Sequence, residues 1–324
     1  MTIKEIAGLA GVSSAAVSRY LNGGYVSEEK KEKISQVIEK TGYRPSAQAR
    51  ILRTKKTRLV GVVVPKISSE SISRITDGIG QVLGKEGYQM LLATTDNDPK
   101  KEVEYMEIFE NYPVDGLLLI ATMLTKQHRK ILKEAKVPIV VIGQQTDDAS
   151  CIYHDDYNAA KELGIFVGKK SKKKIAYIGV TREDKAAGAA REDGFLAGLG
   201  QEGKTVEEGY RMEAEFTMES GYEKTKALLE KKCDIDIISC ATDTIAAGAI
   251  EALGKDFLDR RKDIMITGFG DNQFLKAVTG GIPTVHFGYK TSGIKGAQML
   301  IEMIEKEQDI PMQVKLGYQV RHAW

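Results

Sequence analysis

The segment IKEIAGLAGVSSAAVSRYLNGG, residues 3–24, predicts two short helices that meet through a tight turn. Thr2 and Glu5 have the Ser/Thr-x-x-Glu spacing of a capping box, in which each side chain bonds the other residue's backbone N–H group. We therefore expect the first helix to cover residues 3–10, with Gly11 ending it.

Two further helices are expected in the same N-terminal part of the chain. Ser13 can cap the second helix, which ends at the Asn-Gly-Gly of residues 22–24, where positive φ angles are tolerated. Ser27 can cap a third helix that ends at Gly42. Residues 1–45 are thus predicted to form an all-α head.

The second helix carries the side chains that a helix-turn-helix needs in the major groove of DNA. Arg19 can bond bidentately to guanine, and Ser14, Ala15 and Ser18 can contact a thymine methyl group or share a hydrogen bond with a base edge. An ordinary helical hairpin is the alternative. It would leave the basic charge of this segment unexplained.

The charge of the chain is concentrated at one end. Its 324 residues carry a formal net charge of +2, but residues 1–58 hold 12 Lys and Arg against 5 Asp and Glu, which leaves 35 against 40 for residues 59–324. A basic head on a mildly acidic body is typical of a nucleic-acid-binding module joined to a second domain.

From residue 59 onward, short apolar segments alternate with amphipathic ones, as in parallel sheets covered by helices on both faces. We expect residues 59–324 to form two doubly wound α/β lobes. Between head and body, residues 46–58 read as a short helix (46–53) and a linker. This helix is too short to be stable alone in water, so it should order only against a partner. The expected strands cover residues 59–64, 89–93, 117–121, 139–142, 175–178, 237–241 and 264–267.

These motifs resemble those of the LacI/GalR family of bacterial transcription regulators, and the resemblance covers essentially the whole chain. It implies contacts from the head to the bases and to the backbone of DNA. Base contacts would come from Ser14, Ala15 and Arg19, and backbone contacts from Thr2, Ser18 and Asn22.

The resemblance also implies that residues 46–53 are a hinge helix that folds on operator DNA. In this helix Leu52 would wedge into the minor groove beside Ala49 and kink the duplex. Packing between domains is the alternative role of Leu52. Because a two-fold protein requires a two-fold site, we expect a homodimer on near-palindromic double-stranded operator DNA.

The body of the family resembles periplasmic sugar-binding proteins, which hold a ligand between two lobes. The resemblance implies a first lobe of residues 59–156 and 288–317 and a second lobe of residues 157–287 and 318–324. Ligands of doubly wound sheets bind at the carboxyl ends of the strands. Arg191 matches the sugar-binding arginine of the family.

Other candidate effector-binding residues follow expected strands. Thr242 and Asp243 fall on the usual Asn-Asp pair of the family, although Asp243 could instead cap the next helix. Ser69 and Gln144 each follow a strand of the first lobe. Tyr289 lies near the position of an aromatic residue that stacks on sugar in the family, and core packing would explain it equally well.

Two departures from the family pattern bear on the effector. The usual Gly-aromatic-Asp-Asp segment reads Gly-Phe-Gly-Asp at residues 268–271, so Gly270 replaces an aspartate and Asp271 is retained. Lys66 stands where many relatives have an aspartate; it suits an anionic effector, or it is a solvated surface lysine. Lys66, together with residues 179–181 and 240–244, resembles the sucrose and trehalose operon repressors. The resemblance implies a sugar or sugar phosphate effector.

Other chemistries are not indicated. Residues 198–203 satisfy G-x-G-x-x-G, but they follow a helical segment rather than a strand, so we expect a helix end and no dinucleotide site. The three cysteines lack zinc-site spacing, and the four histidines are scattered. We expect no cofactor, no metal and no catalytic site. Without a signal peptide or an apolar run of membrane-spanning length, the protein is expected in the cytoplasm, with no membrane partner.

The sequence thus predicts a repressor of carbohydrate utilisation genes, of the sucrose or trehalose type, that releases DNA when its effector binds. The alternative is a cytosolic sugar-binding or sugar-phosphate-processing α/β protein without operator function. That alternative does not account for the basic helical head.

Overall fold

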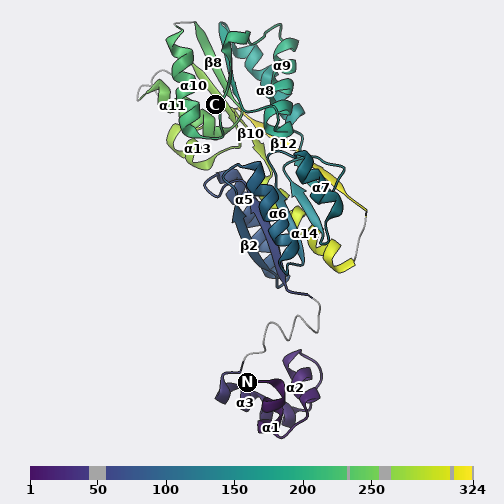
Figure 1. Ribbon diagram of the computed structural model, residues 1–324. Coiled ribbons are helices and arrows are strands. Elements are labelled where there is room, and N and C mark those ends of the chain that lie inside the picture. Colours follow the sequence, from purple (N-terminus) through teal and green to yellow (C-terminus); the bar gives the residue numbers. More distant parts are fainter. Residues whose placement is uncertain (44–55, 232–233, 255–263, 307–309, 323–324) are drawn as a thin grey trace. The chain divides into compact units, whose positions relative to one another are not determined.

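The computed structural model describes residues 1–43, 56–231, 234–254, 264–306 and 310–322 (Figure 1). Two compact units divide the chain, residues 1–57 and residues 58–324. The hinge helix expected at residues 46–53 lies outside the described residues.

The head consists of the three expected helices, α1 (Ile3–Ala10), α2 (Ser14–Leu21) and α3 (Glu28–Thr41). The predicted capping box is present, since Glu5 Oε2 accepts from Thr2 N at 2.7 Å and Thr2 Oγ1 accepts from Glu5 N at 3.3 Å. The prediction for Ser27 is wrong in one respect. Ser27 occupies the N-cap position of α3, but its side chain makes no capping hydrogen bond. The core of the head is built from Ile6, Ala7, Ala10, Val17 and Ile34.

The first lobe of the body is a six-stranded parallel sheet with the order β11-β5-β4-β3-β1-β2. Its strands are β1 (Leu59–Val64), β2 (Gln89–Thr94), β3 (Gly116–Ile120), β4 (Ile139–Ile142), β5 (Ser150–His154) and β11 (Gln313–Leu316). The helices that follow them or return to them are α5 (Glu70–Lys85), α6 (Pro99–Asn111), α7 (Lys126–Glu134) and α14 (Tyr289–Lys306).

The second lobe has a six-stranded sheet with the order β12-β10-β9-β8-β6-β7. Its strands are β6 (Lys174–Gly179), β7 (Arg211–Glu213), β8 (Ile235–Cys240), β9 (Met265–Phe269), β10 (Thr284–Phe287) and β12 (Tyr318–Arg321). Its helices include α8 (Asp156–Lys170), α9 (Arg191–Gln201), α10 (Met218–Glu230), α11 (Asp243–Leu253) and α13 (Gln273–Thr279), with a π-helical turn at Lys185–Ala190 and a 3-10 turn at Glu208–Tyr210.

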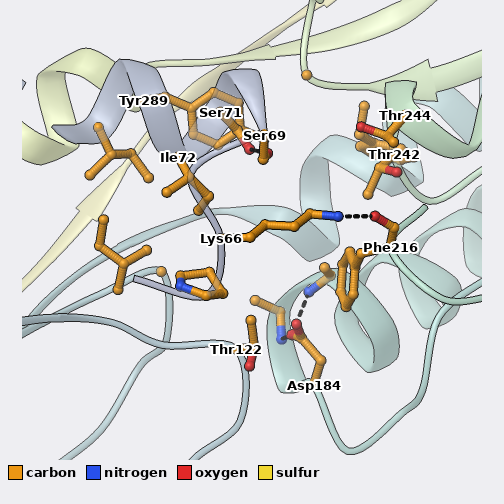
Figure 2. Close-up of a pocket in the computed structure, with 18 of the residues that line it drawn as sticks. Lys66, Ser69, Ser71, Ile72, Thr122, Asp184, Phe216, Thr242, Thr244 and Tyr289 are labelled. Carbon is orange, nitrogen blue, oxygen red and sulfur yellow. Dashed lines mark hydrogen bonds between the residues drawn. The ribbon is translucent and has the colours of Figure 1, made fainter. Parts of the chain in front are cut away.

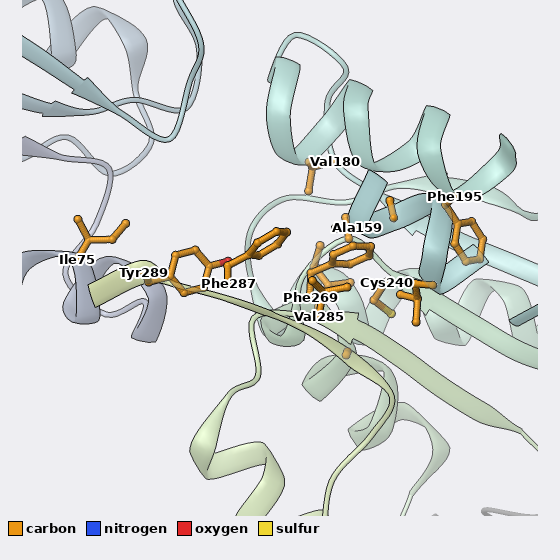
Figure 3. Packing of buried hydrophobic residues seen from close by; sticks show 14 of the residues in the cluster. Ile75, Ala159, Val180, Phe195, Cys240, Phe269, Val285, Phe287 and Tyr289 are labelled. Carbon is orange, nitrogen blue, oxygen red and sulfur yellow. The ribbon is translucent and has the colours of Figure 1, made fainter. Parts of the chain in front are cut away.

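The two doubly wound parallel-sheet lobes expected from the sequence are confirmed, and the second sheet adds one antiparallel edge strand, since β12 pairs antiparallel with β10. The chain passes between the lobes three times, from β5 to α8, from β10 to α14 and from β11 to β12. The exact lobe boundaries stay a prediction. At the second crossing, Tyr289 lies between Ile75 of the first lobe and Phe287 of the second (Figure 3), with 5.9 Å between the centroids of the Tyr289 and Phe287 rings.

Among the described residues, no helix combines the length and the apolar character needed to cross a membrane.

The segment with the G-x-G-x-x-G pattern ends a helix, as expected. Gly198 and Gly200 lie inside α9, and Gly203 follows the helix with a φ of 65°. The element before α9 is the π-helical turn, so no strand precedes the glycines. A Cβ atom on Gly198 would overlap the carbonyl oxygen of Lys161 in α8, so this glycine permits close packing of the two helices.

Two substitutions in α9 test this explanation. We expect Gly198→Ala to lower the free energy of unfolding by about 1–3 kcal/mol, because α9 must shift away from α8. Gly200→Ala is the matched control, since its Cβ would meet nothing within 4 Å. It should leave stability unchanged or raise it by up to about 1 kcal/mol through helix propensity. Urea unfolding followed by circular dichroism measures both, and equal effects would contradict the packing role.

Candidate functional site

Helix α2 presents a surface suited to reading base edges. Ser14, Ala15 and Arg19 are exposed, and Ser18 is half-buried. The opposite side of the helix packs on the core of the head, which directs these side chains outward. The structure thus places all four predicted residues on one helix, as insertion into a major groove requires.

Two predicted backbone contacts lie at helix ends. Thr2 is exposed at the start of α1, and Asn22 is exposed at the end of α2, where its Nδ2 donates to the carbonyl oxygen of Ser18. Polar groups at helix ends are common phosphate ligands. Ala49 and Leu52 lie outside the described residues.

The body contains a cleft where the carboxyl ends of strands from both lobes meet, and a cavity of about 150 Å³ lies in it. Seven of the eight predicted effector-binding residues line this cavity. They are Lys66, Ser69, Gln144, Arg191, Thr242, Asp243 and Tyr289. Doubly wound folds bind ligands at such strand ends. Convergent polar groups on a partly apolar wall are the common form of a small-molecule site.

Lys66 reaches across the cleft from the end of β1. Its Nζ donates to the carbonyl oxygen of Phe216 in the second lobe at 2.5 Å (Figure 2). Burial lowers the pKa of the Lys66 ammonium group, and the nearby Glu215 carboxylate partly opposes this shift. Lys66 is therefore a half-buried residue inside the cleft, and its role toward an anionic effector stays a prediction.

A second contact between the lobes is made by Gln144. Its Nε2 donates to the Thr122 carbonyl oxygen at 2.7 Å and to Asp184 Oδ1 at 2.8 Å. Asp184 Oδ1 also accepts from the backbone N–H groups of Ala186 and Ala187 at the start of the π-helical turn. Burial raises the pKa of Asp184, while these donors counteract the rise.

Arg191 forms part of the floor of the cleft and is 7% exposed. Its Nε donates to Asp156 Oδ1 at 2.8 Å, and its Nη1 donates to the Ala241 carbonyl oxygen at 2.7 Å. Burial alone would lower the pKa of Arg191, but the Asp156 carboxylate, together with Tyr289 and Asp184, outweighs burial and raises it. The guanidinium also lies over the rings of Phe269 and Phe287, 5.0 and 5.1 Å from their centroids.

Asp243 is a buried carboxylate held by donors of the protein itself. Oδ2 accepts from Asn272 N and Oδ1 from Thr284 Oγ1, both at 2.7 Å. Thr242, not Asp243, caps α11, because the Thr242 side chain accepts from Ile245 N. Burial raises the pKa of Asp243 to about 6.

The two glycines of the Gly-Phe-Gly-Asp segment are explained by the close approach of the Asp243 side chain. A Cβ on Gly268 would overlap Asp243 Oδ1, and one on Gly270, which has a φ of 141°, would come within 3.3 Å of Oδ2. Asp271 does not line the cavity. Its backbone has a φ of 51°, and its Oδ2 lies 2.8 Å from His286 Nδ1.

The remaining predicted residues form part of the wall. Ser69 lies just before α5, and its hydroxyl is 2.9 Å from that of Ser71. Tyr289 is 9% exposed, so it is both a core residue and a lining residue, and the two interpretations of this tyrosine do not conflict.

Sequence reasoning missed several lining residues, among them Asp184, Phe216 and His154. Asp184 follows the predicted strand at β6, so the rule that ligands meet strand ends could have identified it. Phe216 follows β7, and His154 is the last residue of β5. Neither of these two strands was predicted from the sequence.

A helix-turn-helix head joined to a two-lobed body with a ligand cleft defines the class of ligand-controlled DNA-binding regulators. Residues 2–46 match the bacterial regulatory proteins of the lacI family, and residues 57–320 match the periplasmic binding proteins and sugar binding domain of the LacI family. The chain therefore belongs to the LacI family. It is a DNA-binding transcriptional repressor with a sugar-binding domain.

Individual relatives agree with this assignment. A sucrose operon repressor of Staphylococcus xylosus is 30% identical over 98% of this chain and 99% of its own length. A catabolite control protein A of Priestia megaterium is 29% identical over 95% of this chain and 93% of its own length. The lac repressor dimer bound to operator and the anti-inducer ONPF shares the fold, with a TM-score of 0.85 and 20% identity over 99% of this chain and 97% of that one.

The buried Asp243 carboxylate predicts a pH dependence of stability. Its pKa of about 6 lies above the ordinary value of 3.8, so the folded state binds this proton more tightly than the unfolded state. The contribution of Asp243 is fully present below about pH 4 and is lost as the pH rises through about 6. We expect the free energy of unfolding of the wild type, minus that of Asp243→Asn, to fall by up to about 3 kcal/mol between pH 4 and pH 7.

Urea unfolding at a series of pH values measures this difference. Asp77→Asn is the control, because it makes the same chemical change at a side chain that is 65% exposed and pairs with Lys290 at the surface. A pH-independent difference for Asp243→Asn would contradict the prediction.

Proposed function

We propose that this chain is a cytoplasmic, dimeric repressor of carbohydrate utilisation genes and that a sugar in the cleft controls its affinity for operator DNA. The observation that carries the proposal is the cleft itself. Lys66 and Gln144 enter it from the first lobe, and Asp184, Arg191 and Asp243 enter it from the second. A ligand that touches both sets has different affinities for different lobe arrangements, which is the requirement for allosteric control.

The lining suits a polyhydroxylated ligand. Carboxylate oxygens can accept hydrogen bonds and the Gln144 amide can both accept and donate them, while Phe216, Ile72 and Tyr289 supply apolar surface. Sucrose and trehalose are our leading candidates, because of the sequence features at Lys66 and at residues 179–181 and 240–244, and because of the similarity to a sucrose operon repressor.

The contacts that now join the lobes indicate how the effector acts. The Lys66 ammonium and the Gln144 amide each donate a hydrogen bond to an acceptor on the opposite lobe, and sugar oxygens can accept hydrogen bonds from the same two donors. When sugar oxygens replace the acceptors on the opposite lobe, two hydrogen bonds between the lobes are lost and the lobes can change their arrangement. We propose that this change is passed to residues 46–53, that these residues act on the minor groove through Leu52 and Ala49 as the family resemblance implies, and that the effector thereby releases DNA.

The Lys66 ammonium group can bind a phosphate group on the sugar. The Arg191 charge is neutralised by Asp156 at 2.8 Å, whereas the Lys66 ammonium donates to a main-chain carbonyl oxygen. A phosphate oxygen is a stronger acceptor than a carbonyl oxygen and would attract this ammonium group. We therefore propose phosphorylated disaccharides as effectors alongside the plain sugars.

Calorimetry with sucrose, trehalose and their 6-phosphates tests the site. We expect Lys66→Ala to weaken binding of the phosphorylated sugar by about 10- to 100-fold, which corresponds to the loss of one charge-assisted hydrogen bond, and to affect the plain sugar less. Lys66→Arg keeps the charge and should retain the preference for phosphate. If both kinds of ligand bind Lys66→Ala as they bind the wild type, the phosphate role of Lys66 is wrong. If none of the four sugars binds the wild type, the proposed effector class is wrong.

DNA binding is tested at Arg19. We expect Arg19→Ala to lose about 1–3 kcal/mol of discrimination between operator and random duplex, because one bidentate base contact is removed. Lys40→Ala, which removes the same charge from α3, should weaken binding to both duplexes alike and reduce the salt dependence. Fluorescence anisotropy at two salt concentrations measures both variants. An equal change of the specificity ratio in the two variants would show that Arg19 reads no base.

A further inference from the structure

His154 is a buried polar residue of the cleft that neither the sequence analysis nor the contacts described above account for. It is the last residue of β5, immediately before the chain first crosses to the second lobe. Its side chain lines the cavity, and the residue is 8% exposed.

One nitrogen of the imidazole is available for a ligand. Nε2 of His154 is buried and has no hydrogen-bond partner in the part of the chain that the structure describes. The ring also forms a hydrogen bond with the backbone of Gly288, and this bond raises the pKa of His154. A bond that raises the pKa of a histidine is one in which a ring N–H group is the donor. Because Nε2 has no partner, this donor is Nδ1–H.

The neutral form of the ring follows from its surroundings. Burial, with smaller contributions from Arg191 and His286, lowers the pKa of His154 to about 4, against the opposing effect of Asp156. A neutral imidazole with its proton on Nδ1 has a lone pair on Nε2, so this atom can only accept a hydrogen bond.

The orientation of the ring is fixed by its neighbours. The His154 ring centroid lies 4.9 Å from that of Phe287 and 5.5 Å from that of Tyr289, the latter in an edge-on arrangement. Both rings belong to the second crossing between the lobes (Figure 3). The acceptor is thus held in place next to the cavity by the segments that connect the lobes.

We propose that His154 is a specificity-determining residue of the cleft, whose Nε2 accepts a hydrogen bond from one hydroxyl group of the bound sugar. This inference rests on the proposed function. A buried acceptor that a hydroxyl satisfies is left unpaired by an analogue that lacks the hydroxyl, so the site discriminates against that analogue. A phosphate oxygen at physiological pH is an acceptor and cannot pair with Nε2. His154 therefore faces an unphosphorylated part of the ligand, and Lys66 takes the phosphate.

The test combines one variant with a series of ligands. His154→Phe keeps a ring between Phe287 and Tyr289 but removes the acceptor. Calorimetry with sucrose, trehalose and their 6-phosphates identifies the sugar that binds the wild type best, and its monodeoxy analogues are then measured with both proteins. We expect His154→Phe to bind the parent sugar about tenfold or more weakly. One monodeoxy analogue should bind the two proteins equally, which identifies the hydroxyl that pairs with His154.

The outcomes separate this inference from the function on which it rests. If the parent sugar binds His154→Phe as tightly as the wild type, or if every monodeoxy analogue distinguishes the two proteins as the parent does, the role of His154 is overturned while the proposed function stands. If none of the four sugars binds the wild type, the proposed function fails and this inference with it.

A second measurement, made on the wild type, tests the inference even if His154→Phe does not fold. Nitrogen-15 NMR of histidine-labelled wild type should show an unprotonated Nε2 on His154 whose resonance moves when the sugar binds. An unchanged resonance with bound sugar overturns the inference.

Discussion

The buried ion pair between Arg191 and Asp156 is the interaction on which the cleft depends. It joins the start of α9 to the start of α8, and the second bond of Arg191, to the Ala241 carbonyl oxygen, adds the end of β8. An unpaired charge at this depth would cost about 3–5 kcal/mol, so the three elements are held together at the floor of the cleft. Asp156 directly follows the first crossing between the lobes, so the floor of the ligand site and the connection between the lobes share residues.

This arrangement couples ligand recognition to the relation between the lobes. Lys66 and Gln144 belong to the first lobe, yet each bonds an atom of the second, at the Phe216 carbonyl oxygen and the Asp184 carboxylate. A sugar that takes these donors replaces contacts between lobes with contacts to itself. Its binding free energy then depends on lobe arrangement. If the lobe arrangement also sets the affinity for operator DNA, as proposed, linkage requires the operator to change the affinity for sugar by the same factor.

Much of the fold and of the site followed from local sequence patterns. The capping box at Thr2, the glycine after α1 and the apolar strands of both lobes were predictable, because caps and periodicity act within a few residues. The strands β5, β7, β10, β11 and β12 were not predicted. The two edge strands β11 and β12 alternate half-buried and exposed residues, and β7 has only three residues, so none of these has a continuous apolar run. Asp271 could not be excluded from the site by sequence alone, because its direction is set by its backbone φ and by His286 on β10.

The central claim is that the basic head recognises a particular DNA sequence and that a sugar in the body alters this recognition. Selection of bound fragments from genomic DNA by the intact purified protein, at physiological ionic strength and with or without sucrose, trehalose and their 6-phosphates, tests it most directly. The account predicts enrichment of a near-palindromic site, and loss of that enrichment when an effector sugar is added. Equal recovery of all fragments, whether sugars are present or absent, would contradict it.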